Sequence, residues 1–141
     1  MDFINPFSKN SENQRLDLAL LVLRLCVGGL MAINHGWGKM LRLFGDEPIK
    51  FADVFGFGVT TSLGLAVFSE LLCAILLVLG LFTRAATIPL IITMAVAAFH
   101  IHWADPFGDK EGALMFLLPY IALLLTGAGR YSLDHQFFGR S

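Results

Sequence analysis

The sequence predicts an all-α integral membrane protein, a four-helix bundle with a short interfacial segment between its first and second helices. Of its 141 residues, 56% are hydrophobic and 15% are charged, and the mean hydropathy is +0.70, a composition typical of membrane proteins. Lipid offers no partner for backbone polar groups, so open strands are excluded, and the apolar runs lack the alternation of barrel strands. Four apolar runs each approach the ~20 residues that cross a ~30 Å hydrocarbon core: residues 17–38, 60–82, 84–103 and 112–129.

The charge of the chain excludes one class of partner. Ten basic and eleven acidic residues give a net charge of −1, and the basic residues form no dense cluster. A nucleic-acid-binding surface needs such a cluster. The expected partners are therefore membrane lipid, other proteins or small molecules.

Polar segments flank one transmembrane domain. We predict a polar N-terminal tail over residues 1–15, a four-helix transmembrane domain over residues 16–135 and a C-terminal tail over residues 136–141. The apolar run that follows the first tail is too long for a signal peptide and lacks a small-residue cleavage site, so we expect it to be retained as the first span.

The connections between the runs differ in length. Residues 81–86 predict a tight turn and residues 100–112 a short loop, whereas residues 41–59 form the long connection. This long connection mixes phenylalanines with charged residues, which is typical of a segment that lies in the membrane interface.

The distribution of basic residues gives a weak indication of orientation. One side of the membrane would carry Lys9, Arg15, Arg84, Arg130 and Arg140, and the other Lys39, Arg42, Lys50 and Lys110. The small excess on the first side favours placing both termini in the cytoplasm.

Two charged residues lie inside the first two runs, Arg24 and Glu70. A charge at the bilayer centre costs at least ~2.5 kcal/mol on insertion scales, so each such group is expected to face the bundle interior and to have a partner. We predict that Arg24 and Glu70 form a buried ion pair. Such a pair serves either to fix helix packing or to handle a proton or ligand.

A second group of polar residues is expected near the bundle end opposite the termini. With steps of ~100° per residue, Arg24, Gly28, Met31 and His35 share one helix face. His35 would then lie level with His100 and Glu111, whereas His102 would point elsewhere. These side chains would line one cavity roofed by the phenylalanine-rich residues 41–59.

Three interpretations of this polar layer remain open. Its side chains are of types that ligate metals, but no HxxxH or CxxC spacing supports a metal site. They could instead hydrogen-bond a small ligand such as a quinone, or be ordinary interfacial residues together with Trp37 and Trp103.

The order of these residues resembles that of the DoxX family of small bacterial membrane proteins. The likeness covers residues 17–135, and Ala128 stands where a proline is common in that family. It rests on Arg24 and Gly28 in the first span, "HGWGK" at 35–39, Glu70, "LGLFTR" at 79–84, Glu111 and "GAGRYSLD" at 127–134. It implies a multi-pass protein of the bacterial cytoplasmic (inner) membrane, in some members a subunit of thiosulfate:quinone oxidoreductase or a partner of redox enzymes.

The first functional hypothesis is a membrane subunit of a quinone-linked oxidoreductase system. Its proton-exchanging residues would be His35, Glu70 and Glu111, and its ligand-binding residues Arg24, Trp37, Lys39 and His100. The sequence has no Rossmann fingerprint, CxxC or CxxCH motif. A redox cofactor would therefore belong to a soluble or membrane partner protein.

Two other hypotheses compete with it. One is a non-catalytic membrane scaffold or assembly factor for a redox or transport complex, whose buried polar groups only fix packing. The other is a small-solute transporter, which would have to form a homo-oligomer to enclose a path, because one four-helix chain without repeats cannot.

Overall fold

The structure, a computed structural model, describes residues 6–139, and side chains from residue 11 onward. The first helical rod consists of α1 (Pro6–Met31), the π-helical segment η1 (Ala32–Gly36) and α2 (Trp37–Leu43). Residues 6–15 of the polar N-terminal segment are thus helical. Residues 1–5 and 140–141 of the two predicted tails lie outside the described residues.

The second rod returns antiparallel to the first and also contains a π-helical segment. It comprises α3 (Val59–Val67), η2 (Phe68–Cys73) and α4 (Ala74–Leu79). Residues 44–58 connect the two rods without helix, and Asp53 in this connection accepts hydrogen bonds from Gly58 N (3.0 Å) and Ser62 Oγ (2.9 Å) at the start of α3. Asp53 thus ties the long connection to the start of the next helix.

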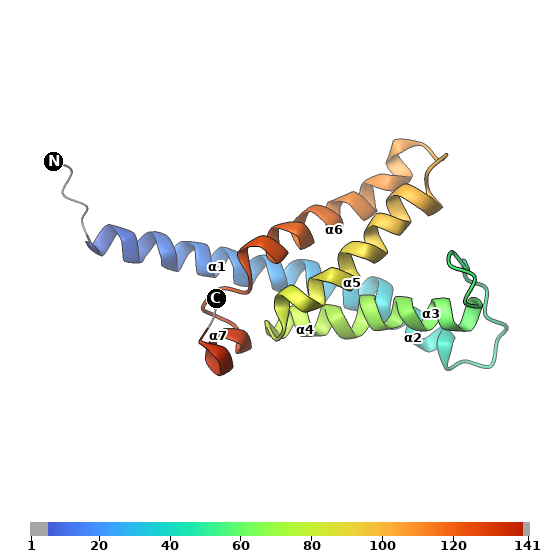
Figure 1. The fold of residues 1–141 in the computed structure, drawn as a ribbon, viewed down its shortest axis with the longest axis horizontal. Coiled ribbons are helices and arrows are strands. Elements are labelled where there is room, and N and C mark those ends of the chain that lie inside the picture. The colour runs from blue at the N-terminus through green and yellow to red at the C-terminus, as the bar shows by residue number, and fades with distance from the viewer. Residues whose placement is uncertain (1–5, 140–141) are drawn as a thin grey trace.

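A helical hairpin crosses the two rods at an angle (Figure 1). Its first arm is α5 (Thr83–Val96) with η3 (Ala97–Ile101), and its second arm is α6 (Phe107–Thr126). The short helix α7 (Leu133–Phe138) then lies beside the turn between α4 and α5.

The predicted helical membrane fold is confirmed in its coarse features. Residues 6–139 contain no strand, and within them three helices are long and apolar enough to cross a membrane: Ser11–Leu43, Val59–Leu79 and Thr83–Ile101. Helix α6 has 20 residues, but Asp109, Lys110 and Glu111 occupy its first turns. Its role as a fourth span stays a prediction.

The core lies where the four long helical segments meet. Met31 of α1, Leu77 of α4, Leu90 of α5 and Leu123 of α6 are fully buried against one another. Large apolar side chains also cover the outside, including Leu18, Val22, Ile33, Leu72, Ile92, Leu118 and Leu125. An apolar exterior of this extent is what a lipid environment requires.

Two glycines bring α1 and the second rod into backbone contact. A Cβ atom at Gly28 would lie 2.9 Å from the Ala74 carbonyl oxygen, and one at Gly36 would lie 2.5 Å from the Glu70 carbonyl oxygen. Small residues of this kind let membrane helices approach closely. This contact fixes the antiparallel register of the two rods.

We therefore expect Gly36→Ala to destabilise the protein, because its Cβ would meet backbone atoms of Glu70 and Leu71 that cannot move independently. Overpacking of this kind costs about 1–3 kcal/mol. Gly38→Ala is the matched control, since nothing lies within 4 Å of its Cβ position. Thermal unfolding in detergent should show a lower Tm only for Gly36→Ala; equal Tm values for both variants would contradict the close contact.

Candidate functional site

The ion pair within the candidate membrane spans differs from the one predicted. Glu70 pairs with Lys39 of α2, and Arg24 instead donates to the backbone carbonyls of Leu77 (3.5 Å) and Tyr131. The prediction of an Arg24–Glu70 pair is therefore wrong. The observed pairing follows from the antiparallel register, which sets Lys39 level with Glu70 and Arg24 level with the end of α4.

The prediction that His35 shares one helix face with Arg24, Gly28 and Met31 is also wrong. Arg24 and Met31 are fully buried, but His35 is exposed, and Gly36 occupies the buried position next to Glu70. The reason is η1, because a π-helical turn accommodates one extra residue and shifts the following side chains by about 100°. The same shift turns Lys39 toward Glu70.

The Lys39–Glu70 pair lies deep in the span. Glu70 is eleven residues beyond Val59, so at ~1.5 Å per residue it lies about 16 Å from that end of the rod. The residue is only 4% exposed, and the Lys39 side chain is 21% exposed. Both charges are therefore largely removed from solvent and compensate each other.

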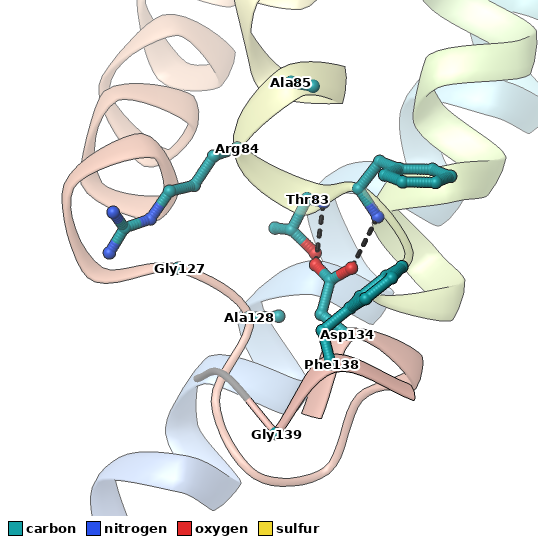
Figure 2. Close-up of a pocket in the computed structure, with 9 residues that line it drawn as sticks. Thr83, Arg84, Ala85, Gly127, Ala128, Asp134, Phe138 and Gly139 are labelled. Carbon is teal, nitrogen blue, oxygen red and sulfur yellow. Dashed lines mark hydrogen bonds between the residues drawn. The ribbon is translucent and has the colours of Figure 1, made fainter. Parts of the chain in front are cut away.

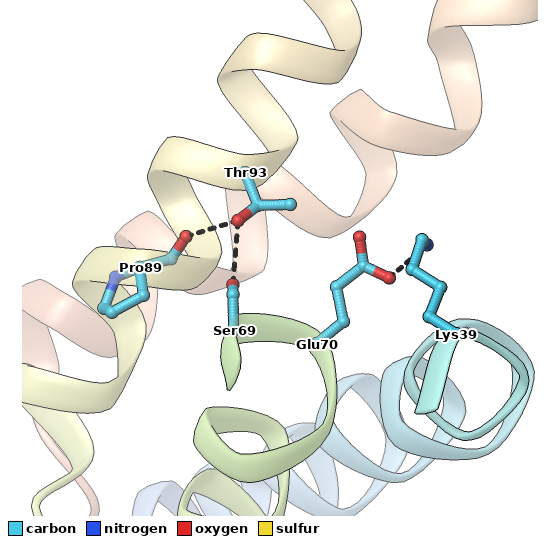
Figure 3. Close-up of polar contacts among 5 residues, drawn as sticks. All are labelled: Lys39, Ser69, Glu70, Pro89 and Thr93. Atoms are coloured by element: carbon cyan, nitrogen blue, oxygen red, sulfur yellow. Dashed lines mark hydrogen bonds and ion pairs between the residues drawn. The ribbon is translucent and has the colours of Figure 1, made fainter. Parts of the chain in front are cut away.

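Ser69, the residue before Glu70, forms a separate polar contact with α5. A 2.8 Å hydrogen bond joins the hydroxyl groups of Ser69 and Thr93, and the Thr93 hydroxyl also donates to the Pro89 carbonyl at 2.8 Å. Figure 3 shows this contact and the Lys39–Glu70 pair on neighbouring parts of η2. Segment η2 thus connects polar groups of α2 and α5.

Aromatic side chains extend from the ion pair toward His35. Tyr120 of α6 is fully buried, donates to the Val27 carbonyl at 3.2 Å, and is close enough to Glu70 for an electrostatic interaction. Phe116 stacks on Tyr120 with ring centroids 6.2 Å apart. His35 and Phe116 form a T-shaped contact with ring centroids 5.7 Å apart. Aromatic contacts therefore lead from the exposed imidazole to the buried ring of Tyr120.

The other predicted site residues lie farther along the hairpin. His100 belongs to η3 and Glu111 to the first turns of α6, and both are exposed, as is Trp37 on α2. In the described part of the chain, no hydrogen bond or ion pair joins His35, His100 and Glu111. The tip of the α5–α6 hairpin diverges from α2 and α3 (Figure 1).

The histidines near this tip do not form a ligand set. His102 pairs with Asp105 at 2.7 Å in the loop. Within residues 11–139, no group of three or more His, Cys, Asp or Glu side chains gathers as a metal site would require. The three-ligand arrangement of His35, His100 and Glu111 is not formed.

A second polar cluster, missed by the sequence analysis, surrounds Arg24. Arg24 is fully buried and donates to the Leu77 carbonyl near the end of α4, while Asp134 accepts hydrogen bonds from Phe82 N (2.7 Å) and Thr83 N (2.9 Å) at the start of α5. Figure 2 shows these two bonds. Arg24 and Asp134 also attract each other electrostatically. Together the two charges cap both sides of one tight turn.

The C-terminal segment reaches this cluster from far along the sequence. Arg130 N donates to Asp17 Oδ1 at 3.0 Å, and Asp134 N donates to the Gly80 carbonyl at 2.8 Å. Gly80 has φ of 68°, and a Cβ there would collide with the Arg24 guanidinium. The stretches "LGLFTR" and "GAGRYSLD", noted separately in the sequence, thus pack on each other. The presence of both stretches in one chain was the sequence signal that could have predicted this contact.

The two clusters have different chemical capacities. Arg24 and Asp134 are held by backbone groups, which suits a structural role. Lys39 and Glu70 bond to each other through side chains alone, and such a pair can exchange a proton or release one partner to a ligand. The candidate site is therefore Lys39 and Glu70 with Tyr120, Phe116 and His35.

Removing one member of the buried pair should destabilise the protein strongly. Glu70→Gln or Lys39→Met leaves one charge uncompensated, at a cost of about 3–5 kcal/mol for a buried pair. The double variant Lys39→Met/Glu70→Gln should recover much of the loss in a double-mutant cycle of detergent unfolding. Additive losses in the double variant would contradict a coupled pair.

Comparisons with known proteins agree with this membrane fold. The family model of DoxX matches residues 19–103. An uncharacterized protein of Haemophilus influenzae is 36% identical over 126 residues, which cover 84% of this chain and 90% of that protein. An uncharacterized membrane protein of Mycobacterium tuberculosis is 31% identical over 137 residues, covering 87% of this chain and 83% of that protein. No solved structure matches the chain. The chain therefore belongs to the DoxX family of membrane proteins.

Proposed function

We propose that the protein is the membrane subunit of a quinone-linked oxidoreductase system. The observation that carries the proposal is the Lys39–Glu70 pair deep inside the span, adjoining two π-helical segments. Ionisable residues within membrane spans commonly mark proton or ligand pathways, and π-helical turns are frequent at functional sites. Membership of the DoxX family, broadly linked to membrane-associated oxidoreductases, supports the same class.

In this proposal the quinone ring binds beside η1, at His35 and Phe116. The exposed imidazole supplies a hydrogen bond to a ring carbonyl, and Phe116 packs against it. Trp37, exposed on the next turn, borders the approach from the interface. Gly38 leaves the backbone open to a flat ligand, whereas Gly36 packs against the Glu70 backbone.

Proton transfer is assigned to titratable groups beside this ring and farther along the α5–α6 hairpin. Reduction of a quinone takes up protons as well as electrons, so the site needs titratable groups within reach. Glu70 and Lys39 hold protons inside the span, while His35, His100 and Glu111 exchange them with water. Arg24 is left out of this set, because its guanidinium donates to the backbone carbonyls of Leu77 and Tyr131 at the other end of the molecule.

Electron transfer is assigned to a partner protein that carries the redox cofactor. The chain itself supplies binding, orientation and proton exchange. The proposed setting is the bacterial inner membrane, with α6 as the fourth span and both termini in the cytoplasm. The partner would then meet the membrane subunit where electrons can reach the bound quinone.

A ligand-stabilisation experiment tests the proposal. Decylubiquinone should raise the Tm of the purified protein in detergent, because a ligand that binds only the folded state stabilises it. His35→Ala should abolish the shift. His102→Ala is the matched control and should keep it, since His102 bonds to Asp105 in the loop away from Phe116.

Two further outcomes would contradict quinone binding. Decanol, which has the alkyl tail without the ring, should give no comparable shift; an equal shift would indicate unspecific apolar binding. Equal shifts in the wild type and His35→Ala, or none in either, would favour the non-catalytic scaffold instead.

A further inference from the structure

A groove of about 840 Å³ lies at the turn between the second and third spans, far from the candidate quinone site. Phe82, Thr83, Arg84 and Ala85 form one wall at the start of α5, and the other wall consists of Gly127, Ala128, Asp134, Phe138 and Gly139. Figure 2 shows the Arg84 side chain and Asp134 on different sides of this groove. Neither the polar layer nor the proposed quinone site uses these residues.

The groove contains backbone N–H groups that have no partner within the helix. An α-helix leaves its first N–H groups without intrahelical partners. At α5, Asp134 takes the N–H groups of Phe82 and Thr83. The next two belong to Arg84 and Ala85, both of which line the groove. The helix start therefore still offers donors and a partial positive charge to an anion.

A buried hydroxyl in the same wall also has an unused hydrogen-bonding capacity. Thr83 is only 1% exposed, and its Oγ1 has no partner among the described residues. An unpaired buried hydroxyl is costly and calls for an explanation. A bound oxyanion at the start of α5 would supply the missing acceptor.

The charges around the groove favour an anion. Asp134 is the acidic side chain in its lining, but both its oxygens accept backbone hydrogen bonds and Arg24 attracts its charge. Arg84 is exposed, its guanidinium contacts only the Leu125 carbonyl at 3.4 Å, and no carboxylate pairs with it in the described part of the chain. Arg84 is thus the uncompensated charge of the groove.

The position of the groove selects the source of the anion. The turn at Phe82 separates two membrane-spanning helices, so it lies at the level of lipid headgroups. Phe82 and Phe138 pair at 5.8 Å between ring centroids, and both are more than half exposed. Aromatic rings at this level contact the glycerol and upper acyl region.

We propose that this groove binds the phosphate of an anionic phospholipid. The phosphate accepts from Arg84, from the Arg84 and Ala85 backbone N–H groups and from Thr83 Oγ1. The acyl chains run along Phe82 and Phe138 into the bilayer. The site is independent of the proposed quinone site.

Native mass spectrometry of the delipidated full-length protein in detergent tests the proposal with three probes. Dioleoylphosphatidylglycerol should bind about tenfold more tightly than dioleoylglycerol, which lacks the phosphate, as expected for one or two charge-assisted hydrogen bonds. Inorganic phosphate alone should not bind detectably. Competition of phosphate at the same affinity as the lipid would overturn the lipid assignment in favour of a free-phosphate site.

Variants locate the binding site. Arg84→Gln should weaken phosphatidylglycerol binding about tenfold, whereas Arg42→Gln, which removes an exposed arginine at the opposite end of the bundle, should leave it unchanged. Thr83→Val keeps the side-chain shape and should weaken binding severalfold, which provides a second test if Arg84→Gln does not fold. Equal affinities in all four proteins would overturn the proposal.

Discussion

The close antiparallel contact of α1 with η2 and α4 is the constraint on which the other interactions depend. Gly28 and Gly36 let the two backbones touch, and this contact allows only one register. Lys39 is then level with Glu70, and Arg24 with the last carbonyls of α4. A larger residue at either glycine would separate the helices and the charges that they align.

The lipid environment explains why the buried charges of Arg24 and Glu70 both have partners. Without water, an unpaired charge or backbone group has no alternative partner. Around the α4–α5 turn, Arg24 and Asp134 satisfy groups from three different parts of the chain. This turn therefore joins the C-terminal segment to the first helix, which no local interaction could do.

The two ends of the molecule differ in the hydrogen-bonding capacity that their polar groups leave unused. At the end that carries α7, backbone partners hold Arg24 and Asp134, and Arg84 and Thr83 keep free hydrogen-bonding capacity toward the interface. Toward the other end, Lys39 and Glu70 have each other as partners, and the rings of Tyr120 and Phe116 lead outward to His35. The first arrangement suits anchoring, and the second suits exchange of protons with a ligand.

The sequence by itself determined the helical membrane class, because burial in lipid demands long apolar runs that composition reveals directly. It also identified Glu70 and His35 as unusual polar groups in those runs. The tertiary structure alone decided their surroundings: Glu70 pairs with Lys39, and His35 turns outward. A sequence pattern assumes regular steps of ~100° per residue, whereas partners depend on helix register and phase. The glycine contacts between helices set the register, and the π-helical turn η1 sets the phase. The contacts and the turn arise only when the helices pack.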